Sequence, residues 1–249
     1  LLVGNKDNKV NGILICLDSI EEIIDEAINK NCNLVIAHHP IVFSGLKKFT
    51  SSNYIEKTII KAIKNDINIY AFHTNLDNII NGVNSKLADL LELQNISILK
   101  PKKNQLIKIS VFAPKDKADN VRNAMFNAGA GNIGNYSNCS FNTEGQGSFM
   151  ANKNSNPYVG EVNKLHLEKE VKIEVIVPAH LKNIVIEQMI TAHPYEEVAY
   201  DIYPLENSHS KIGAGIIGEL DYEINSKDFL LQIKKKLNIS SIRYTDLCK

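Results

Sequence analysis

The sequence predicts a layered α/β domain that is interrupted by a second, antiparallel α+β module. Short apolar runs alternate with amphipathic helical segments over residues 12–91, the pattern of parallel strands joined by right-handed helical crossovers. A strand, a proline and a helix then follow one another twice within residues 107–192. After Gly213 a short strand and a helix return to the style of the first region.

The first region contains three apolar runs typical of buried strands, at residues 12–18, 34–37 and 67–72. Ser19 is a candidate N-cap for a helix on residues 20–28, whose apolar side chains recur at helical spacing. Further helices are expected at the same spacing over residues 53–64 and 83–91. Ligands bind outside the carboxyl ends of parallel strands, so the polar residues that follow the strands are site candidates. These candidates are Asp18, His38, His39, His73 and Asp77.

The second module is predicted from an internal repeat. Residues 107–114 and 171–178 share an alternating pattern that ends in proline, and a helix is expected after each. Two copies of strand, helix and strand predict a split βαβ, ferredoxin-like module with an antiparallel sheet. We expect residues 1–103 to form the first part of the α/β domain, residues 104–206 the insert, and residues 207–249 the start of the second part.

The stretch between the two repeats is rich in glycine, asparagine and serine, and we expect a hairpin with long loops over residues 129–160. Its segment Gly129–Gly134 follows a helix rather than a strand, which is the wrong context for a dinucleotide-binding loop. Turn glycines are the better interpretation.

The paired histidines at the end of the second strand indicate a metal site. Pro40 keeps His39 extended, and neighbouring side chains on an extended backbone diverge, so His38 and His39 would each hold a different ion. Asp77 supplies a carboxylate that can bridge two cations, as two-metal hydrolytic sites require. Imidazole and carboxylate ligands suit Zn, Fe or Mn better than Ca or Mg. We therefore predict His38, His39 and Asp77 as metal ligands.

Each candidate has a structural alternative. His38 and His39 can be packed or hydrogen-bonded core histidines, and Asp18 can cap the following helix. His73 is expected to orient water or substrate, or to be structural. A group later in the chain is open between a metal site, a small-molecule site and a solvated helix-to-strand turn: His193, Glu196 and Glu197.

Composition narrows the class of protein. Hydrophobic residues make up 44% and charged residues 22% of the 249 residues, as in globular proteins. The formal net charge is zero and the longest basic run is Lys234–Lys236, so nucleic acid is not favoured as a partner. No apolar run approaches the roughly 18–20 residues that span a bilayer. Four scattered cysteines, Cys16, Cys32, Cys139 and Cys248, predict free thiols in a reducing cytoplasm.

These motifs together resemble the NIF-three-like dinuclear metal-centre family, whose bacterial members are often labelled GTP cyclohydrolase 1 type 2 homologues. The segments that carry the resemblance are Leu1–Gly4, the strand that ends in Asp18, Ile36–Pro40 with Phe43 and Leu46, and His73–Asp77. The insert resembles the PII/CutA-like module of the longer bacterial members. That resemblance is carried by Asn127–Tyr136, Cys139–Phe141, Gly160–Glu161 and Ala192–Glu197.

The resemblance implies two lobes, a pair of divalent metals at their junction, and a homo-oligomeric ring, commonly a hexamer. His38 and His39 match the paired histidine ligands of the family, and Asp77 matches its bridging aspartate. The remaining family ligands are a histidine and a glutamate on a near-C-terminal helix, which we expect beyond Lys249. The family's usual opening residues are likewise expected ahead of Leu1.

The expected function is that of a metal-dependent hydrolase acting on a nucleotide-like or other phosphorylated small molecule. The family label suggests GTP, but the chain has no P-loop and no arginine cluster. The alternative is a non-catalytic, metal-binding regulatory ring protein whose insert senses a small molecule.

Overall fold

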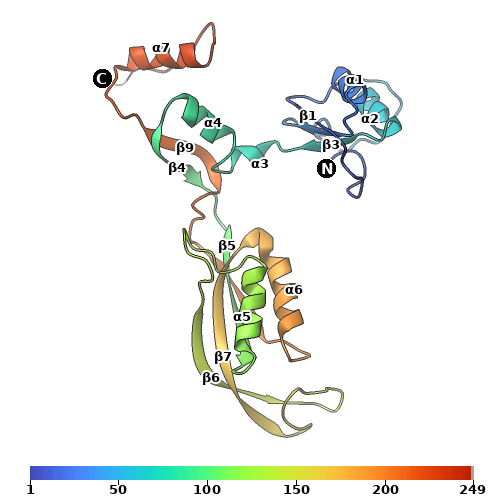
Figure 1. Cartoon of the computed structure of the whole chain (residues 1–249), viewed down its shortest axis with the longest axis vertical. Coiled ribbons are helices and arrows are strands. Elements are labelled where there is room, and N and C mark those ends of the chain that lie inside the picture. The colour runs from blue at the N-terminus through green and yellow to red at the C-terminus, as the bar shows by residue number, and fades with distance from the viewer. Residues whose placement is uncertain (248–249) are drawn as a thin grey trace. The chain divides into compact units, whose positions relative to one another are not determined.

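The computed structural model describes residues 1–247, which fold into two compact units (Figure 1). Unit 1 contains residues 1–96 together with the chain from residue 215 onward, and unit 2 contains residues 97–214. Unit 2 is therefore inserted into the sequence of unit 1. The helices and strands of unit 1 up to this insertion are β1 (Ile13–Cys16), α1 (Glu21–Asn29), β2 (Leu34–Ala37), α2 (Tyr54–Lys64), β3 (Asn68–Ala71), α3 (Thr74–Asp77) and α4 (Val83–Leu90).

Unit 1 is built on a three-stranded parallel sheet in the order β1-β2-β3, as the alternation of strands and helices predicted. Helices α1 and α2 pack on it and on each other. The fully buried side chains between sheet and helices are Ile24, Ala27, Val35, Ala62 and Ile69. Because the strands are parallel, their carboxyl ends meet at one edge of the sheet.

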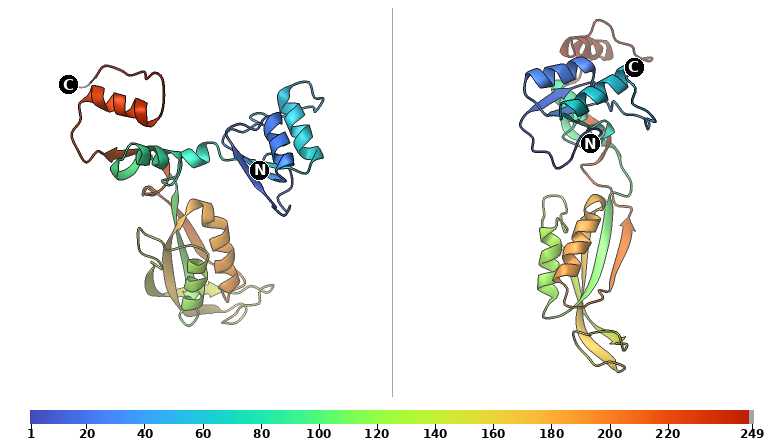
Figure 2. Two further views of the ribbon diagram at one scale, coloured as in Figure 1. Left: turned by 45° about the horizontal axis from the view of Figure 1, so that its top comes forward. Right: turned by 90° about the vertical axis from the view of Figure 1, so that its right-hand side faces the viewer.

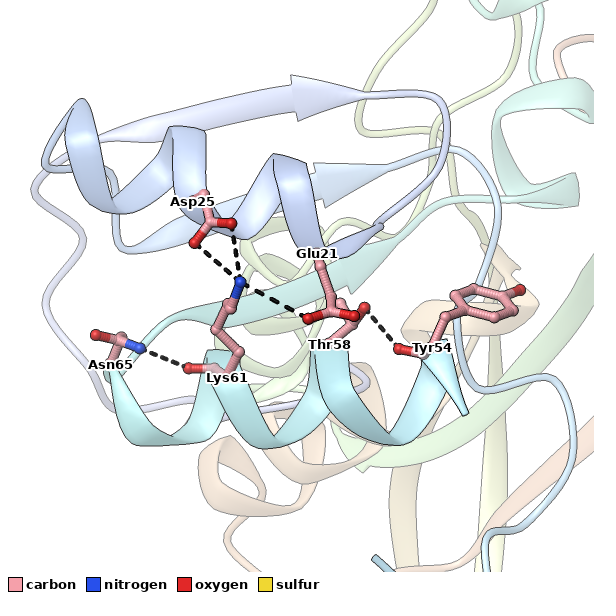
Figure 3. A network of polar contacts seen from close by, with 6 residues as sticks. All are labelled: Glu21, Asp25, Tyr54, Thr58, Lys61 and Asn65. Atoms are coloured by element: carbon pink, nitrogen blue, oxygen red, sulfur yellow. Dashed lines mark hydrogen bonds and ion pairs between the residues drawn. The ribbon is translucent and has the colours of Figure 1, made fainter. Parts of the chain in front are cut away.

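A polar network aligns the two helices (Figure 3). Lys61 of α2 donates through Nζ to both carboxylate oxygens of Asp25 on α1, at 2.8 and 3.0 Å. Glu21, one turn earlier on α1, lies 3.7 Å from the same ammonium group. Within α2, the Thr58 hydroxyl donates to the carbonyl of Tyr54 at 2.8 Å. The network fixes how α1 and α2 lie beside each other on the sheet.

The start of α2 is anchored by a buried carboxylate. Asn53 caps the helix by accepting from the Glu56 N–H at 2.9 Å. The Glu56 carboxylate in turn accepts from the N–H groups of Thr50 (2.8 Å) and Ser52 (3.0 Å). These hydrogen bonds, together with those from the Ser52 and Thr50 hydroxyls, lower the pKa of Glu56 to about 2. These hydrogen bonds therefore fix the part of the loop that directly precedes α2.

Two local predictions in unit 1 are wrong. The apolar run at residues 12–18 predicts a fully buried strand, but Ile13 is 52% and Ile15 78% exposed. The reason is that β1 is an edge strand with α1 packed on one face, so alternate side chains point away from the core. Ser19 does not cap α1: Ile20 occupies the N-cap position without a side-chain cap bond, and the Ser19 hydroxyl is buried.

Unit 2 is a β-α-β-β-α-β arrangement with a four-stranded antiparallel sheet in the order β6-β7-β5-β8. Both α5 and α6 lie on one face of this sheet (Figure 2). The core between them includes Val121 and Met125 of α5 and Val185 and Met189 of α6. The elements are β5 (Leu106–Pro114), α5 (Ala118–Asn127), β6 (Phe141–Met150), β7 (Leu165–Pro178), η1 (Ala179–Leu181), α6 (Lys182–Ala192) and β8 (Tyr200–Leu205).

The short strand predicted after Gly213 is present as β9 (Gly213–Glu219), but its partner strand β4 (Gln94–Pro101) and the pairing between them were not indicated by the sequence. Strand β4 pairs with β9, although residues 101–104 have the composition of a linker. The last element is α7 (Ser226–Lys236), capped by the Asn225 side chain. The division between the units falls inside β4, after Ile96, and inside β9, before Gly215. The domain boundaries predicted from the sequence, at 103/104 and 206/207, stay a prediction. Across residues 1–247, no helix is both long and apolar enough to cross a membrane.

Candidate metal centre

Three histidine side chains gather at the carboxyl edge of the parallel sheet. The hydrogen-bond ladder continues past the strands: His38 donates its N–H to the Cys16 carbonyl at 3.1 Å, and His73 donates to the His38 carbonyl at 2.9 Å. The ring centroids lie 4.8 Å apart for His38 and His39, 6.0 Å for His38 and His73, and 6.3 Å for His39 and His73. We call these three side chains the imidazole cluster. The sheet, through its register, brings them together. The expectation that the side chains of His38 and His39 diverge is wrong, because these two residues form a bend after β2 instead of continuing the extended strand.

Asp18, at the end of β1, orients one imidazole of the cluster. Its Oδ1 lies 2.8 Å from His39 Nδ1, and about half of each side chain is exposed. A carboxylate accepts from Nδ1–H, which leaves the lone pair of Nε2 free to bind a metal. Asp18 therefore supports His39 across the strand ends instead of capping α1. No local sequence pattern links Asp18 with His39, which lies 21 positions later. Both residues follow strands of the same parallel sheet, however, and this shared position could have predicted their contact.

His73 has a strained backbone. Its φ of 41° and ψ of −130° lie in a region that side chains other than glycine rarely adopt. Such strain costs about 1–3 kcal/mol and gathers at functional sites. The exposed Phe43 ring lies 6.3 Å from the His73 ring. Sequence reasoning gives His73 a supporting role, and the structure places its ring directly among the other two imidazoles.

Asp77 is the last residue of the short helix α3. Its backbone carbonyl accepts from the Asn84 side chain at 2.8 Å, and its own side chain is half-buried. Among the hydrogen bonds and ion pairs of residues 1–247, none joins its carboxylate to the imidazole cluster. As the side chains of these residues lie, no three His, Cys, Asp or Glu groups are placed to hold a metal ion. The donor types fit a transition metal, while the predicted set of His38, His39 and Asp77 stays a prediction.

Other residues singled out in the sequence have structural roles. Gly129, Gly131 and Gly134 have positive φ values of 100°, 74° and 58°, so they are turn glycines, as predicted. The described cysteines, Cys16, Cys32 and Cys139, are free thiols, and burial raises the pKa of Cys16. Cys248 lies outside the described residues.

The fold and the cluster define a class: an α/β protein with clustered histidines at the carboxyl edge of a parallel sheet and a second α+β unit inserted in its chain. A model of the family described as Duf34/NIF3 (NGG1p interacting factor 3) matches residues 1–248. The chain belongs to this family.

Relatives with curated names carry the label GTP cyclohydrolase 1 type 2 homolog. The protein from Bacillus subtilis (strain 168) is 43% identical over 244 residues, which cover 98% of this chain and 65% of the relative. The protein from Listeria monocytogenes is 41% identical over 246 residues, with 98% and 66% covered. The chain thus spans about two thirds of the length of these relatives.

Solved structures show the same fold. A Bacillus cereus protein related to NIF3 is 44% identical with a TM-score of 0.78, and the match covers 96% of this chain and 64% of that one. A Staphylococcus aureus protein is 33% identical with a TM-score of 0.66, covering 97% and 63%. The similarity runs through both units of the chain.

Proposed function

We propose that His38, His39 and Asp77 contribute ligands to a dinuclear divalent-metal centre, and that the whole protein is a metal-dependent hydrolase. The substrate class is a nucleotide-like or other phosphorylated small molecule. One observation carries the proposal: the imidazoles of His38, His39 and His73 cluster within 4.8–6.3 Å at the edge of a parallel sheet where ligands bind. Zn, Fe or Mn suits these donors.

The residues of the chain have distinct roles in this proposal. Asp18 holds the Nδ1–H of His39 and so presents its Nε2 outward. His38, whose ring centroid lies 4.8 Å from that of His39, would hold the second ion, and the Asp77 carboxylate would be shared between the two. When bound, the divalent ions would lower the pKa of a water molecule to about 7 and polarise the bond under attack. His73, whose ring lies 6.0 Å from that of His38 and 6.3 Å from that of His39, would orient the water or the substrate.

The family supports further parts of the proposal. By family resemblance, a histidine and a glutamate from a later helix complete the ligand set, and copies of the protein assemble into a ring, commonly a hexamer. The names of the relatives support a nucleotide as substrate. The antiparallel β-α-β-β-α-β arrangement of unit 2 supports a PII/CutA-like insert. The free thiols of the described cysteines support a cytoplasmic protein.

Metal titration tests the ligand role of the cluster. Isothermal titration of the 249-residue chain with Zn²⁺ should give an affinity that falls at least tenfold in His39→Ala. His180→Ala is the matched control, because it removes an exposed histidine of unit 2 and should leave the affinity unchanged. Equal affinities for both variants and the unaltered chain would refute the assignment.

A substrate panel then separates enzyme from regulator. Saturable hydrolysis of a nucleotide or phosphomonoester by the metal-loaded protein, lost in His39→Ala, supports the hydrolase. Metal binding without turnover across the panel supports the second candidate, a regulatory metal-binding ring protein with a small-molecule-sensing insert. That candidate rests on a separate observation: unit 2 has a ligand-sized cavity of its own.

A further inference from the structure

A cavity of about 480 Å³ lies within unit 2. Its walls come from the end of β6 and the loop after it, from β5 and β7, and from the turn that leads from α6 to β8. Small-molecule pockets commonly have volumes of roughly 300–1,000 Å³ and apolar walls with a few placed polar groups. The size of this cavity is that of a small organic ligand.

Aromatic side chains form much of the wall: Phe112, Phe149, Tyr158 and Tyr195. The Tyr195 ring lies between two of them, with centroids 6.0 Å from Phe149 and 6.2 Å from Tyr158. Aromatic faces carry negative charge density, so they stack on flat groups and attract cations. The wall therefore favours a flat or positively charged ligand.

The charged groups in the lining are all acidic. Glu170, Glu196 and Glu197 line the cavity, and no lysine, arginine or histidine does. Glu170 accepts from the Tyr195 hydroxyl at 3.0 Å, and Glu196 accepts from the Asn156 N–H at 2.9 Å. Throughout residues 1–247, no salt bridge neutralises any of the three carboxylates. A cation entering the cavity would find uncompensated negative charge.

A glycine in the neighbouring strand leaves space that the Glu170 carboxylate occupies. A Cβ at Gly147 would collide with the Glu170 carboxylate, so the missing side chain makes room for the acid within the wall. The carboxylate is half-buried there, against Gly147 and Tyr195. These contacts hold the negative charge of Glu170 at a defined place in the wall of the cavity.

Tyr195 packs against His193, which is only 7% exposed and whose ring centroid lies 5.0 Å from that of Tyr195. His193 Nε2–H donates to the Phe112 carbonyl at 2.9 Å, and its Nδ1 accepts from the Tyr195 N–H at 3.1 Å. Both ring nitrogens are thus used by the neutral imidazole, and burial lowers the pKa of His193. The turn is built before a ligand arrives, which lowers the ordering cost of binding.

We propose that this cavity binds a small organic cation, namely an amine or amidine attached to a flat apolar body. The flat body stacks among Phe149, Tyr158 and Tyr195, and the cationic group approaches Glu170 and Glu197. Phosphate-bearing and other anionic ligands are disfavoured by the same carboxylates. The site is assigned to unit 2 alone and goes beyond the proposed metal chemistry, on which it does not depend.

Two probes that differ mainly in charge test the proposal. Tryptamine and indole-3-propionate share an indole ring and a two-carbon chain, but carry an ammonium and a carboxylate. Calorimetric titration of the 249-residue chain at pH 7 should show saturable 1:1 binding of tryptamine. Indole-3-propionate should bind at least tenfold more weakly. Equal affinities, or no saturable binding of tryptamine, would overturn the proposal.

Matched variants locate the site. Glu170→Gln removes the charge but keeps an oxygen for the Tyr195 hydroxyl, and should weaken tryptamine binding at least fivefold. Glu144→Gln is the control, because Glu144 lies on β6, pairs with Lys115 at 2.7 Å and does not line the cavity. Tyr158→Ala, at a 48% exposed position, should also weaken binding. Circular dichroism checks that each variant is folded, and unchanged binding in folded Glu170→Gln and Tyr158→Ala refutes the site.

Two further measurements distinguish a ligand site in unit 2 from an interface between copies and from the metal centre of unit 1. Sedimentation velocity tests whether a second copy covers the cavity. If tryptamine binding is lost as the chain self-associates, the cavity is part of an interface between copies and the ligand proposal is wrong. Tryptamine titration of His39→Ala should match that of the unaltered chain, with or without EDTA. The metal proposal and the cation proposal can therefore fail independently.

Discussion

Replacement of Asp18 by alanine tests how the candidate metal centre is supported. The change removes the oxygen 2.8 Å from His39 Nδ1 and leaves His39 free to rotate and to change tautomer. Loss of such a supporting partner costs about 10–100-fold in metal affinity. Both side chains are about half exposed, so a water molecule can partly replace the Asp18 carboxylate as the hydrogen-bond partner of His39. We therefore expect a loss of metal affinity at the lower end of this range. The predicted loss is about tenfold, or about 1.4 kcal/mol.

Competition of the chain with a chromophoric Zn²⁺ chelator measures this loss directly. Asp7→Ala is the control, because the Asp7 carboxylate is 74% exposed and lies 3.5 Å from Lys6. The nearby Asn5 bonds to Asn68, the first residue of β3, so this segment lies at the opposite end of the strand from the imidazole cluster. Thermal unfolding without metal should be nearly the same for both variants. An unchanged zinc affinity in Asp18→Ala, or an equal loss in Asp7→Ala, would refute the reasoning.

Three further predictions concern stability, each measured by urea unfolding. The pKa of His193 is below its ordinary value of 6.5, so the unfolded chain takes up a proton first as the pH falls. The free energy of unfolding should therefore drop below about pH 6.5, by at most about 1.4 kcal/mol per pH unit. His193→Gln should remove this contribution. Gly131→Ala should cost about 1–3 kcal/mol, because φ is +74° and a Cβ would lie 2.7 Å from the Phe126 ring; an unchanged midpoint would contradict this. Met189→Ala, at a fully buried position, should cost about 2–5 kcal/mol, whereas Ile190→Ala, next along α6 and 42% exposed, should cost much less.

The elements that follow local periodicity could be predicted from the sequence. Strand β2 has the predicted bounds, and α2 and α4 begin and end within a residue of theirs, because apolar spacing and flanking polar residues are local signals. The internal repeat likewise indicated the two strand–helix pairs of unit 2. Placing polar residues at strand ends was enough to bring His38, His39 and His73 to one edge.

Features that depend on distant partners could not be predicted. The β4–β9 pair joins segments more than a hundred residues apart, and β4 has no clear alternation of exposed and buried residues to announce it. The backbone of His73, with φ 41° and ψ −130°, lies outside the left-handed region that histidine sometimes adopts, so no local signal in the sequence announces it. The contacts of Glu170 with Gly147 and Tyr195 bring together three segments of the chain: β7, β6 and the turn between α6 and β8. Each of these features exists only after the chain has folded.

The most direct test of the dinuclear metal centre is an anomalous difference map, recorded at the zinc edge, from crystals of the chain grown with Zn²⁺. We predict peaks within coordination distance of the His38 and His39 imidazoles, with the Asp77 carboxylate turned toward them. A map without a peak at this edge of the sheet, or with zinc held only by other side chains, would contradict the proposed ligand set.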